Sequence, residues 1–292
     1  MVLSAVGCAP KNNDFKYCID EFADVKIMRY RIECWDSLSF QQKRYVYHLA
    51  EAAKWGRDIF WDQHCACGLQ VRHALEQVFD HYKGARKGQD WDDFVVYAKR
   101  VFFASGIHHH YSQDKFYPDC PSDYMASVLK ESGVEDIDTL IKVMYDRNFL
   151  LQRRCTDNSK DIVAESSINF YQGGLTREEV DAFYAAMARK NDPRPLSYGL
   201  NSTLVKENGK IFERVWNLDS PYGPAIQKMI DELEIASQYA ENEAQKAYLA
   251  LLINYYKTGD LKTWDDFNVA WVQEKEGAID LIHGFIEDYE DP

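Results

Sequence analysis

The 292-residue sequence lacks several features that would place it in a common protein class. No stretch is long and apolar enough to cross a membrane. No Walker loop, GxGxxG segment or GxSxG segment is present, which removes the usual signals for nucleotide binding and for a serine hydrolase. No linker rich in glycine, serine and proline interrupts the chain. We therefore expect a flexible start over residues 1–13 and one lobe over residues 14–292.

The histidines also lack the pattern of a zinc peptidase, which places two histidines one helical turn apart beside a glutamate base. None of the eight histidines is followed by glutamate. Two clusters offer ligating side chains, His108–His110 and His64–Cys67. Consecutive side chains diverge on a helix, and the Cys65/Cys67 pair has no second pair at a zinc spacing. We expect no metal site in this chain, and an unrelated metal-dependent enzyme that uses these clusters remains an alternative.

The charge is unbalanced, with 34 basic and 47 acidic residues and a formal net charge of -13. Nucleic-acid binding requires a basic patch, so this balance argues against it. An acidic field favours a cationic ligand such as a peptide amine, although solubility accounts for most such charges. Seven scattered cysteines indicate free thiols and a cytoplasmic protein. Met1–Cys8 resembles the end of a lipoprotein signal, so a periplasmic or lipid-anchored location through Cys8 is the alternative.

Hydrophobic periodicity predicts a mostly helical α+β chain with one hairpin. Asn208-Gly209 supplies a two-residue turn between strands at Ser197–Glu207 and Lys210–Asn217. Lys26–Arg31 is a candidate for a further strand, since a hairpin alone is marginally stable. Helices are predicted from capping boxes, apolar spacing and stop signals at Ser39–Ala53, Val71–Tyr82, from Trp91, from Thr176, Ile226–Leu233, Tyr248–Gly259 and from Trp264.

An apolar stripe at helical spacing runs into the C-terminal end, at Ile279, Ile282, Ile286 and Tyr289. It predicts a helix on which Glu287 is a solvated neighbour. A second interpretation stays open, because Glu287 and Tyr289 point apart on a helix but share one face of an extended segment. If both contact one ligand, the helix must end near Gly284 and the chain must run extended to Pro292.

The segment Gly284-Phe-Ile-Glu-x-Tyr-x-Asp-Pro292 resembles a signature of the dipeptidyl peptidase III family of zinc exopeptidases. Three further segments resemble the same family, in its order: Leu49–Gly56, Gly106–Pro118 and Ser197–Leu204. The chain departs from the pattern at Glu290, where an arginine is frequent in other members. This puts in doubt any contact that the family makes there.

The resemblance implies a two-lobed enzyme that removes dipeptides from peptides with a free N-terminus. This chain would be the first, substrate-binding lobe, mostly helical around a small antiparallel β-core that forms part of a β-barrel. Zinc would be bound by the second lobe, outside this chain, so the chain is expected to be a fragment that is inactive alone. The alternative is a stand-alone, non-catalytic peptide-binding module.

The resemblance also implies roles for three side chains. Tyr289 would be catalytic and donate a hydrogen bond to the oxyanion that forms at the scissile carbonyl. Glu287 would bind the N-terminal amine of the substrate, and a carboxylate facing an ammonium makes a strong, charge-assisted hydrogen bond. Tyr111 would border the cleft as a further substrate-binding residue.

Overall fold

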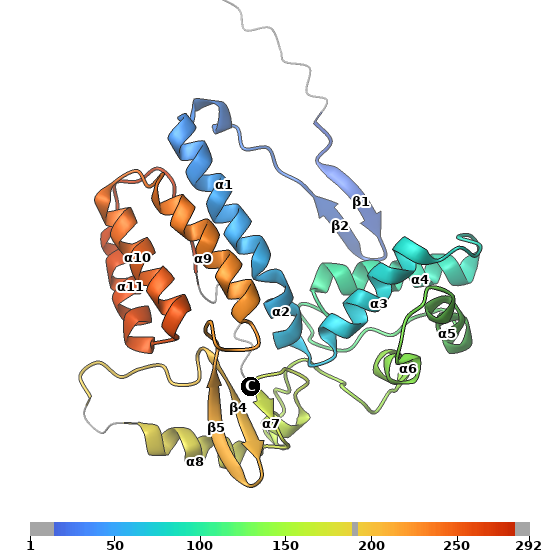
Figure 1. Ribbon diagram of the computed structural model, residues 1–292. Coiled ribbons are helices and arrows are strands. Elements are labelled where there is room, and N and C mark those ends of the chain that lie inside the picture. Colours follow the sequence, from blue (N-terminus) through green and yellow to red (C-terminus); the bar gives the residue numbers. More distant parts are fainter. Residues whose placement is uncertain (1–14, 189–191, 284–292) are drawn as a thin grey trace, which may run out of the picture. The chain divides into compact units, whose positions relative to one another are not determined.

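A computed structural model describes residues 15–188 and 192–283 (Figure 1). The chain forms two compact units, residues 1–37 and 38–292. Among the described residues, no helix combines the length and apolar character that a membrane crossing needs.

The first unit contains a two-stranded antiparallel sheet of β1 (Cys18–Phe22) and β2 (Val25–Met28), followed by the short 3-10 helix η1 (Trp35–Ser37). The predicted strand at Lys26–Arg31 therefore exists in part. The expectation that it would extend the hairpin sheet is wrong, because the tight turn after Phe22 gives β2 a local partner in β1.

The second unit is mostly helical, and the helices predicted from Ser39 up to the one at Trp264 are present within a few residues of their expected bounds. Both capping boxes are confirmed, since the side chains of Ser39 and Thr176 accept hydrogen bonds from the third residue of their helices. The helices are α1 (Phe40–Trp55), α2 (Arg57–His64), α3 (Gly68–His81), α4 (Gln89–Ala104), α5 (Ser122–Glu131), α6 (Ile137–Tyr145), α7 (Ile162–Glu165), α8 (Arg177–Met187), α9 (Gly223–Ser237), α10 (Glu243–Thr258) and α11 (Leu261–Gln273).

A three-stranded sheet in the second unit has the order β3-β4-β5, from β3 (Tyr171–Gln172), β4 (Ser202–Glu207) and β5 (Lys210–Val215). The hairpin of β4 and β5 is confirmed, and both turn residues, Asn208 and Gly209, have the positive φ that such a turn requires. Residues 197–201 form a turn instead of the predicted start of the strand. The third strand, β3, pairs parallel with β4.

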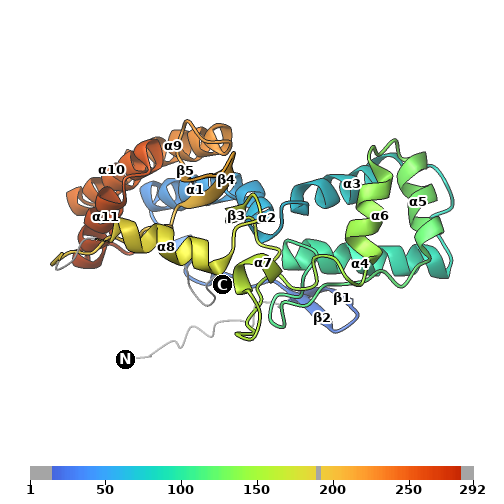
Figure 2. The ribbon, with the colours of Figure 1, turned by 90° about the horizontal axis from the view of Figure 1, so that it is seen from below.

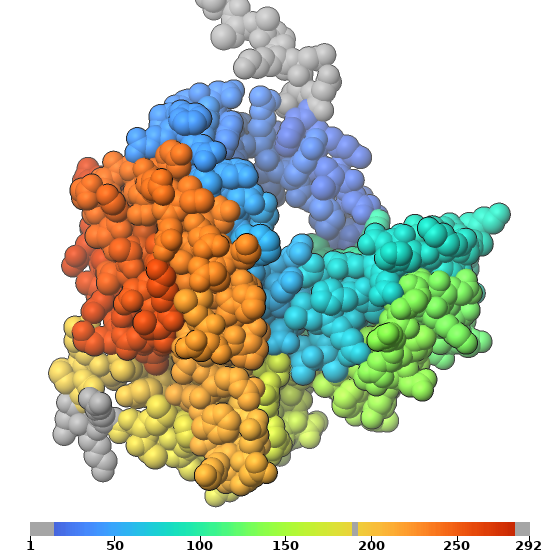
Figure 3. Space-filling view, in the orientation of Figure 1, coloured from blue at the N-terminus to red at the C-terminus, as the bar shows by residue number. Residues whose placement is uncertain are grey.

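Buried side chains gather in two main clusters in the second unit. One cluster is centred on α3, α4, α5 and α6 and includes Leu75, Phe94 and Met125. The other joins α1 to α9, α10 and α11 through Tyr45, Ile230 and other residues. Figure 2 shows these two groups of helices, and in the space-filling view of Figure 3 the surfaces of α1 and α9 meet directly.

The chain after α11 differs from the sequence-based expectation. Both interpretations of the C-terminal stripe predict a helix before Gly284, and this is wrong for residues 279–283, which are not helical. The reason is a set of polar side chains that replace helical hydrogen bonds. The backbone N–H groups of Glu276 and Gly277 donate to the carboxylate of Glu274, and the N–H of Ile279 donates to Glu241.

Candidate functional site

The sequence-predicted site residues fall on two segments of the second unit. Tyr111 lies on the loop that runs from Gly106 to Pro118. Glu287 and Tyr289 follow the described segment 274–283 and lie outside the described residues, as does Cys8 in the first unit. The geometry of the site therefore rests on the loop and on the segment that leads to Glu287.

The loop from Gly106 to Pro118 begins where α4 ends. Ser105 ends the helix with a φ of 52°, in the left-handed region. The chain then folds back on itself, and the N–H of Phe116 donates to the carbonyl of Ile107 at 2.8 Å. At the tip, Nδ1 of His109 accepts hydrogen bonds from the backbone N–H groups of Tyr111 and Ser112, each at 3.1 Å. The imidazole of His109 thus holds the backbone at Tyr111 and Ser112 in this conformation.

The ring of Tyr111 is available to a ligand. The residue is 79% exposed, and its ring packs against His110 with 4.3 Å between the ring centroids. The two rings are tilted by 49° to one another, so the loop tip offers an aromatic surface with a polar hydroxyl at its edge. Tyr111 therefore lies exposed at a loop tip, and its role at the border of the substrate cleft stays a prediction.

Two buried side chains support the base of this loop. His108 is 1% exposed, and its Nε2 donates to the carbonyl of Leu150 at 2.9 Å. Burial lowers the pKa of His108 to about 4, so the ring is neutral at neutral pH. Lys115 is 6% exposed and donates to the carbonyls of Asp146 and Phe149, each at 2.7 Å. Burial lowers the pKa of Lys115 to about 8.

His64, at the end of α2, connects that helix to the lower part of the loop. Its Nδ1 donates to the carbonyl of Ser105 at 2.9 Å, and its Nε2 lies 3.5 Å from a guanidinium nitrogen of the buried Arg153. The clusters around His64 and His108, which are 44 positions apart in the sequence, therefore belong to one polar core beneath the loop. The histidines position the loop through hydrogen bonds to backbone carbonyls.

The histidine and cysteine clusters do not fit a zinc site. Within residues 15–188 and 192–283, no group of three or more His, Cys, Asp or Glu side chains is placed to hold a metal ion. His64 and His108 each direct a ring nitrogen at a carbonyl instead. A structural or catalytic zinc site needs at least three protein ligands around one point. No chemical step is therefore assigned to a metal held by these residues.

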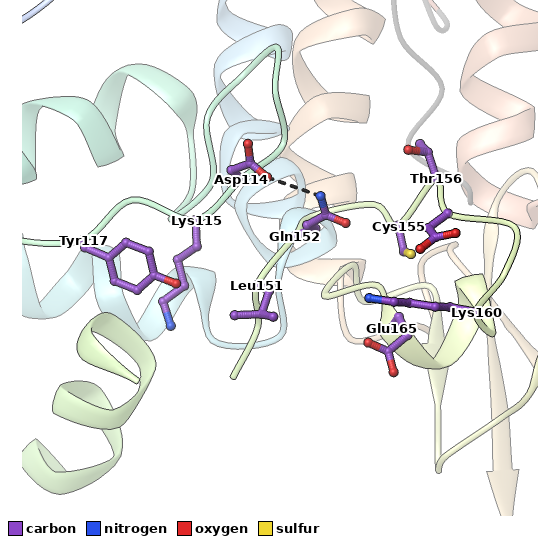
Figure 4. Close-up of a pocket in the computed structure, with 10 residues that line it drawn as sticks. Asp114, Lys115, Tyr117, Leu151, Gln152, Cys155, Thr156, Lys160 and Glu165 are labelled. Carbon is purple, nitrogen blue, oxygen red and sulfur yellow. Dashed lines mark hydrogen bonds between the residues drawn. The ribbon is translucent and has the colours of Figure 1, made fainter. Parts of the chain in front are cut away.

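A cavity of about 530 Å³ lies beside the loop (Figure 4). In Figure 4, Lys115 and Tyr117 lie on one side of the view, and Cys155, Lys160 and Glu165 lie on the other. Its volume is in the range of small-ligand sites. With charged groups of both signs, it can hold a zwitterionic or peptide-like molecule. The lining residues are Asp114, Lys115, Tyr117, Leu151, Gln152, Cys155, Thr156, Asp157, Lys160 and Glu165.

Sequence reasoning missed this cavity and the role of Lys115. The residues from 151 to 165 show no motif and no periodicity, so nothing local marks them as a site. Only folding brings them to the loop, where Gln152 donates to the carboxylate of Asp114 at 3.2 Å.

The protonation of Lys115 leads to a pH-dependent prediction. Because its pKa falls from 10.5 to about 8 on folding, the unfolded chain keeps a proton that the folded chain releases. The free energy of unfolding of the wild type, relative to Lys115→Met, is expected to rise by about 2 kcal/mol between about pH 7.5 and about pH 9.5. Urea unfolding of both proteins at these pH values measures the difference. A difference that stays constant or falls would contradict the assignment.

Comparison with known proteins identifies the class. The model of Peptidase family M49 matches residues 138–292, more than half of the chain. The chain belongs to this peptidase family, whose members are zinc metallopeptidases, and the resemblance to dipeptidyl peptidase III is confirmed.

Individual relatives agree with this assignment. The chain is 23% identical to dipeptidyl peptidase 3 of Homo sapiens and 24% identical to that of Mus musculus, over 89% of this chain and 41% of each relative. It thus spans less than half the length of these curated relatives. The fold resembles the structure of DPP III from Caldithrix abyssi, with a TM-score of 0.55 and 19% identity over 88% of this chain and 38% of that one.

Proposed function

We propose that these 292 residues form the substrate-binding part of a zinc dipeptidyl peptidase, which removes dipeptides from peptides with a free N-terminus. The observation that carries this proposal is the family match, which runs through residue 292 and so includes the segment Gly284–Pro292. The α+β fold, shared with solved DPP III structures, supports it.

Three side chains receive roles in this proposal. Glu287 binds the ammonium group of the peptide, and Tyr289 donates its hydroxyl hydrogen bond to the developing oxyanion. Tyr111 contacts the peptide from the tip of its loop, a role supported by its 79% exposure. The active protein would bind zinc through residues outside these 292, and the lobe that carries them would be the structural partner of this one.

The chain alone is expected to bind no stoichiometric zinc and to release no dipeptides. The reason is that the metal and the general base are needed together at the scissile bond. Zinc content by mass spectrometry and release of a dipeptide fluorophore measure both properties, with the full-length protein as the comparison. One zinc ion per 292-residue chain, or dipeptide release by it, would contradict the proposed division of roles.

A full-length protein that binds peptides with a free N-terminus but never cleaves them would overturn the enzymatic proposal. That result would favour a non-catalytic peptide-binding module. Cleavage by the full-length protein that stops when zinc is chelated and returns when zinc is restored would support the proposal.

A further inference from the structure

Two cysteines lie two positions apart at the junction of α2 and α3 (Figure 1). The N–H of Gly68 donates to the carbonyl of Cys65 at 2.7 Å, which closes a β-turn with Ala66 and Cys67 at its two central positions. Cys67 has a φ of -94° and a ψ of 0°, the values typical of the third residue of a type I turn. A turn brings its first and third Cα atoms closer together than an extended chain does. It therefore holds the two cysteines within the span of about 4.4–6.8 Å that a disulfide bridges.

The two thiols contact each other across this turn. The S–H group of Cys65 donates a hydrogen bond to the sulfur of Cys67. The turn is closely packed against α2, because a Cβ at Gly68 would lie 2.3 Å from the carbonyl oxygen of Trp61, a distance that real Cβ atoms do not adopt. Only glycine lets the backbone pass this close to the helix. A bond between the two sulfurs would thus join atoms that the fold already brings together.

The two cysteines differ in their access to solvent. Cys65 is fully buried, whereas Cys67 is half-buried. The hydrogen bond from Cys65 lowers the pKa of Cys67, because it stabilises the Cys67 thiolate. The same hydrogen bond, together with burial, raises the pKa of Cys65. Since the thiolate is the reactive form of cysteine, Cys67 is the member of the pair that an external reagent attacks or meets first.

The other cysteines of the second unit that the structure describes are less accessible than Cys67. Cys120 is 2% exposed and Cys155 is 3% exposed. The sulfur of Cys120 lies 3.5 Å from the hydroxyl oxygen of Tyr145, and burial raises the pKa of Cys120, which disfavours its thiolate. Access, a lowered pKa and a neighbouring thiol therefore come together at Cys67.

We propose that Cys65 and Cys67 are a redox pair, which a hydroperoxide oxidises to an intrachain disulfide and a small thiol reduces again. The Cys67 thiolate attacks the outer oxygen of the peroxide and the O–O bond breaks. The sulfenic acid of Cys67 forms, and the departing oxygen takes up a proton and leaves as an alcohol, or as water where the oxidant is hydrogen peroxide. The sulfur of Cys65 then attacks the sulfur of Cys67 and displaces water, which carries away the proton of the Cys65 thiol. The two electrons that reduce the O–O bond thus come from the two sulfur atoms.

The disulfide is expected to be reversible. It would close a loop with only Ala66 between the two cysteines, and the stabilisation that a disulfide provides grows with the length of the loop it closes. A bond in such a short loop is strained, and thiols reduce strained disulfides more readily than structural ones. Two molecules of a small thiol restore both cysteines and leave as their own disulfide. The inference goes beyond the proposed function, since neither a peptide nor zinc takes part in these steps.

The test treats the reduced, full-length protein with hydrogen peroxide and then blocks free thiols with N-ethylmaleimide. Trypsin releases residues 58–72 as one peptide, which contains Cys65 and Cys67 and no other cysteine. Mass spectrometry of this peptide from the wild type is expected to show no maleimide adduct and the loss of two hydrogen atoms. Reduced glutathione is expected to restore both thiols. Cys120→Ser is the matched control and is expected to react as the wild type does.

Two variants test the separate roles of the two cysteines. Cys65→Ser is expected to stop at the sulfenic acid of Cys67, which dimedone captures, because the second thiol is gone. Cys67→Ser is expected to react with peroxide at least about tenfold more slowly, because the remaining thiol is buried and protonated. Should either variant fail to fold, the peptide from the wild type decides the question alone.

The outcomes decide whether the fold makes these cysteines a pair. A reversible disulfide within residues 58–72, formed faster in the folded protein than in the urea-unfolded protein, would support the inference. Formation at the same rate in both states would show that proximity in the sequence is sufficient, and it would overturn the role of the turn. The inference would also fall if both thiols stayed free after peroxide, if Cys67 paired with a cysteine outside this peptide, or if the two variants reacted equally fast.

Discussion

Replacing Tyr289 with phenylalanine in the full-length protein is expected to reduce turnover by about 10²–10³-fold. The change removes one hydroxyl group and keeps the ring, so packing is preserved. If the hydroxyl donates to the oxyanion, its hydrogen bond strengthens as negative charge develops on that oxygen. The loss should therefore appear in kcat, while the Michaelis constant stays close to its wild-type value. Steady-state kinetics with a peptide that has a free N-terminus measures both constants.

A matched control is available on α1. Tyr47 is 52% exposed, and Tyr47→Phe makes the same chemical change far along the chain from the proposed site. The control is expected to retain full turnover and the same unfolding temperature as Tyr289→Phe. Wild-type turnover in Tyr289→Phe would remove the oxyanion role, and the proposal would then need another donor.

Local signals in the sequence predicted most of the fold. The capping boxes at Ser39 and Thr176 mark helix starts because their hydrogen bonds form within four residues. The same holds for the Asn208-Gly209 turn, and for Gly259, whose φ of 71° ends α10. Each of these features depends only on neighbours in the chain, and a sequence displays such neighbours directly.

Distant partners explain where prediction failed. The C-terminal stripe has helical spacing, but Glu241 lies 38 positions before Ile279 and takes its backbone N–H. An apolar pattern cannot show that the half-buried carboxylate of Glu241 and the buried amide of Gln245 will compete with helical hydrogen bonds. The strand predicted at Lys26–Arg31 has a different explanation: its partner β1 is local, but the sequence spacing shows the strand and not which strand it pairs with.

In the candidate site, too, the local features could be predicted from the sequence and the long-range contacts could not. The family resemblance located the loop of Tyr111, and the structure adds the reason for its shape, in the hydrogen bonds that His109 accepts. The polar core beneath it joins His64 to Arg153 across 89 positions. Hydrogen bonds over such separations follow from tertiary packing. Because of these hydrogen bonds, the two histidine clusters, which resemble metal ligands in the sequence, support a loop in the structure.

Replacing Glu287 with glutamine is expected to raise the Michaelis constant for peptides with a free N-terminus by about 10- to 100-fold. A hydrogen bond to a charged group contributes about 1.5–3 kcal/mol, and each 1.36 kcal/mol corresponds to a factor of ten. Glutamine keeps the size and one acceptor oxygen but loses the charge that faces the ammonium. Because the amine stays bound during the reaction, kcat should change much less than the Michaelis constant.

Two comparisons make the Glu287 result specific. Glu290→Gln removes the same charge three residues later, at the position where the chain departs from the family pattern, and it is expected to leave the Michaelis constant unchanged. In the wild type, N-acetylation of a competing peptide should weaken inhibition as strongly as the Glu287 substitution does. In Glu287→Gln, N-acetylation of the competing peptide should weaken inhibition only slightly further, because the carboxylate that distinguishes an amine from an amide is gone. Equal discrimination by both proteins would show that another group anchors the amine.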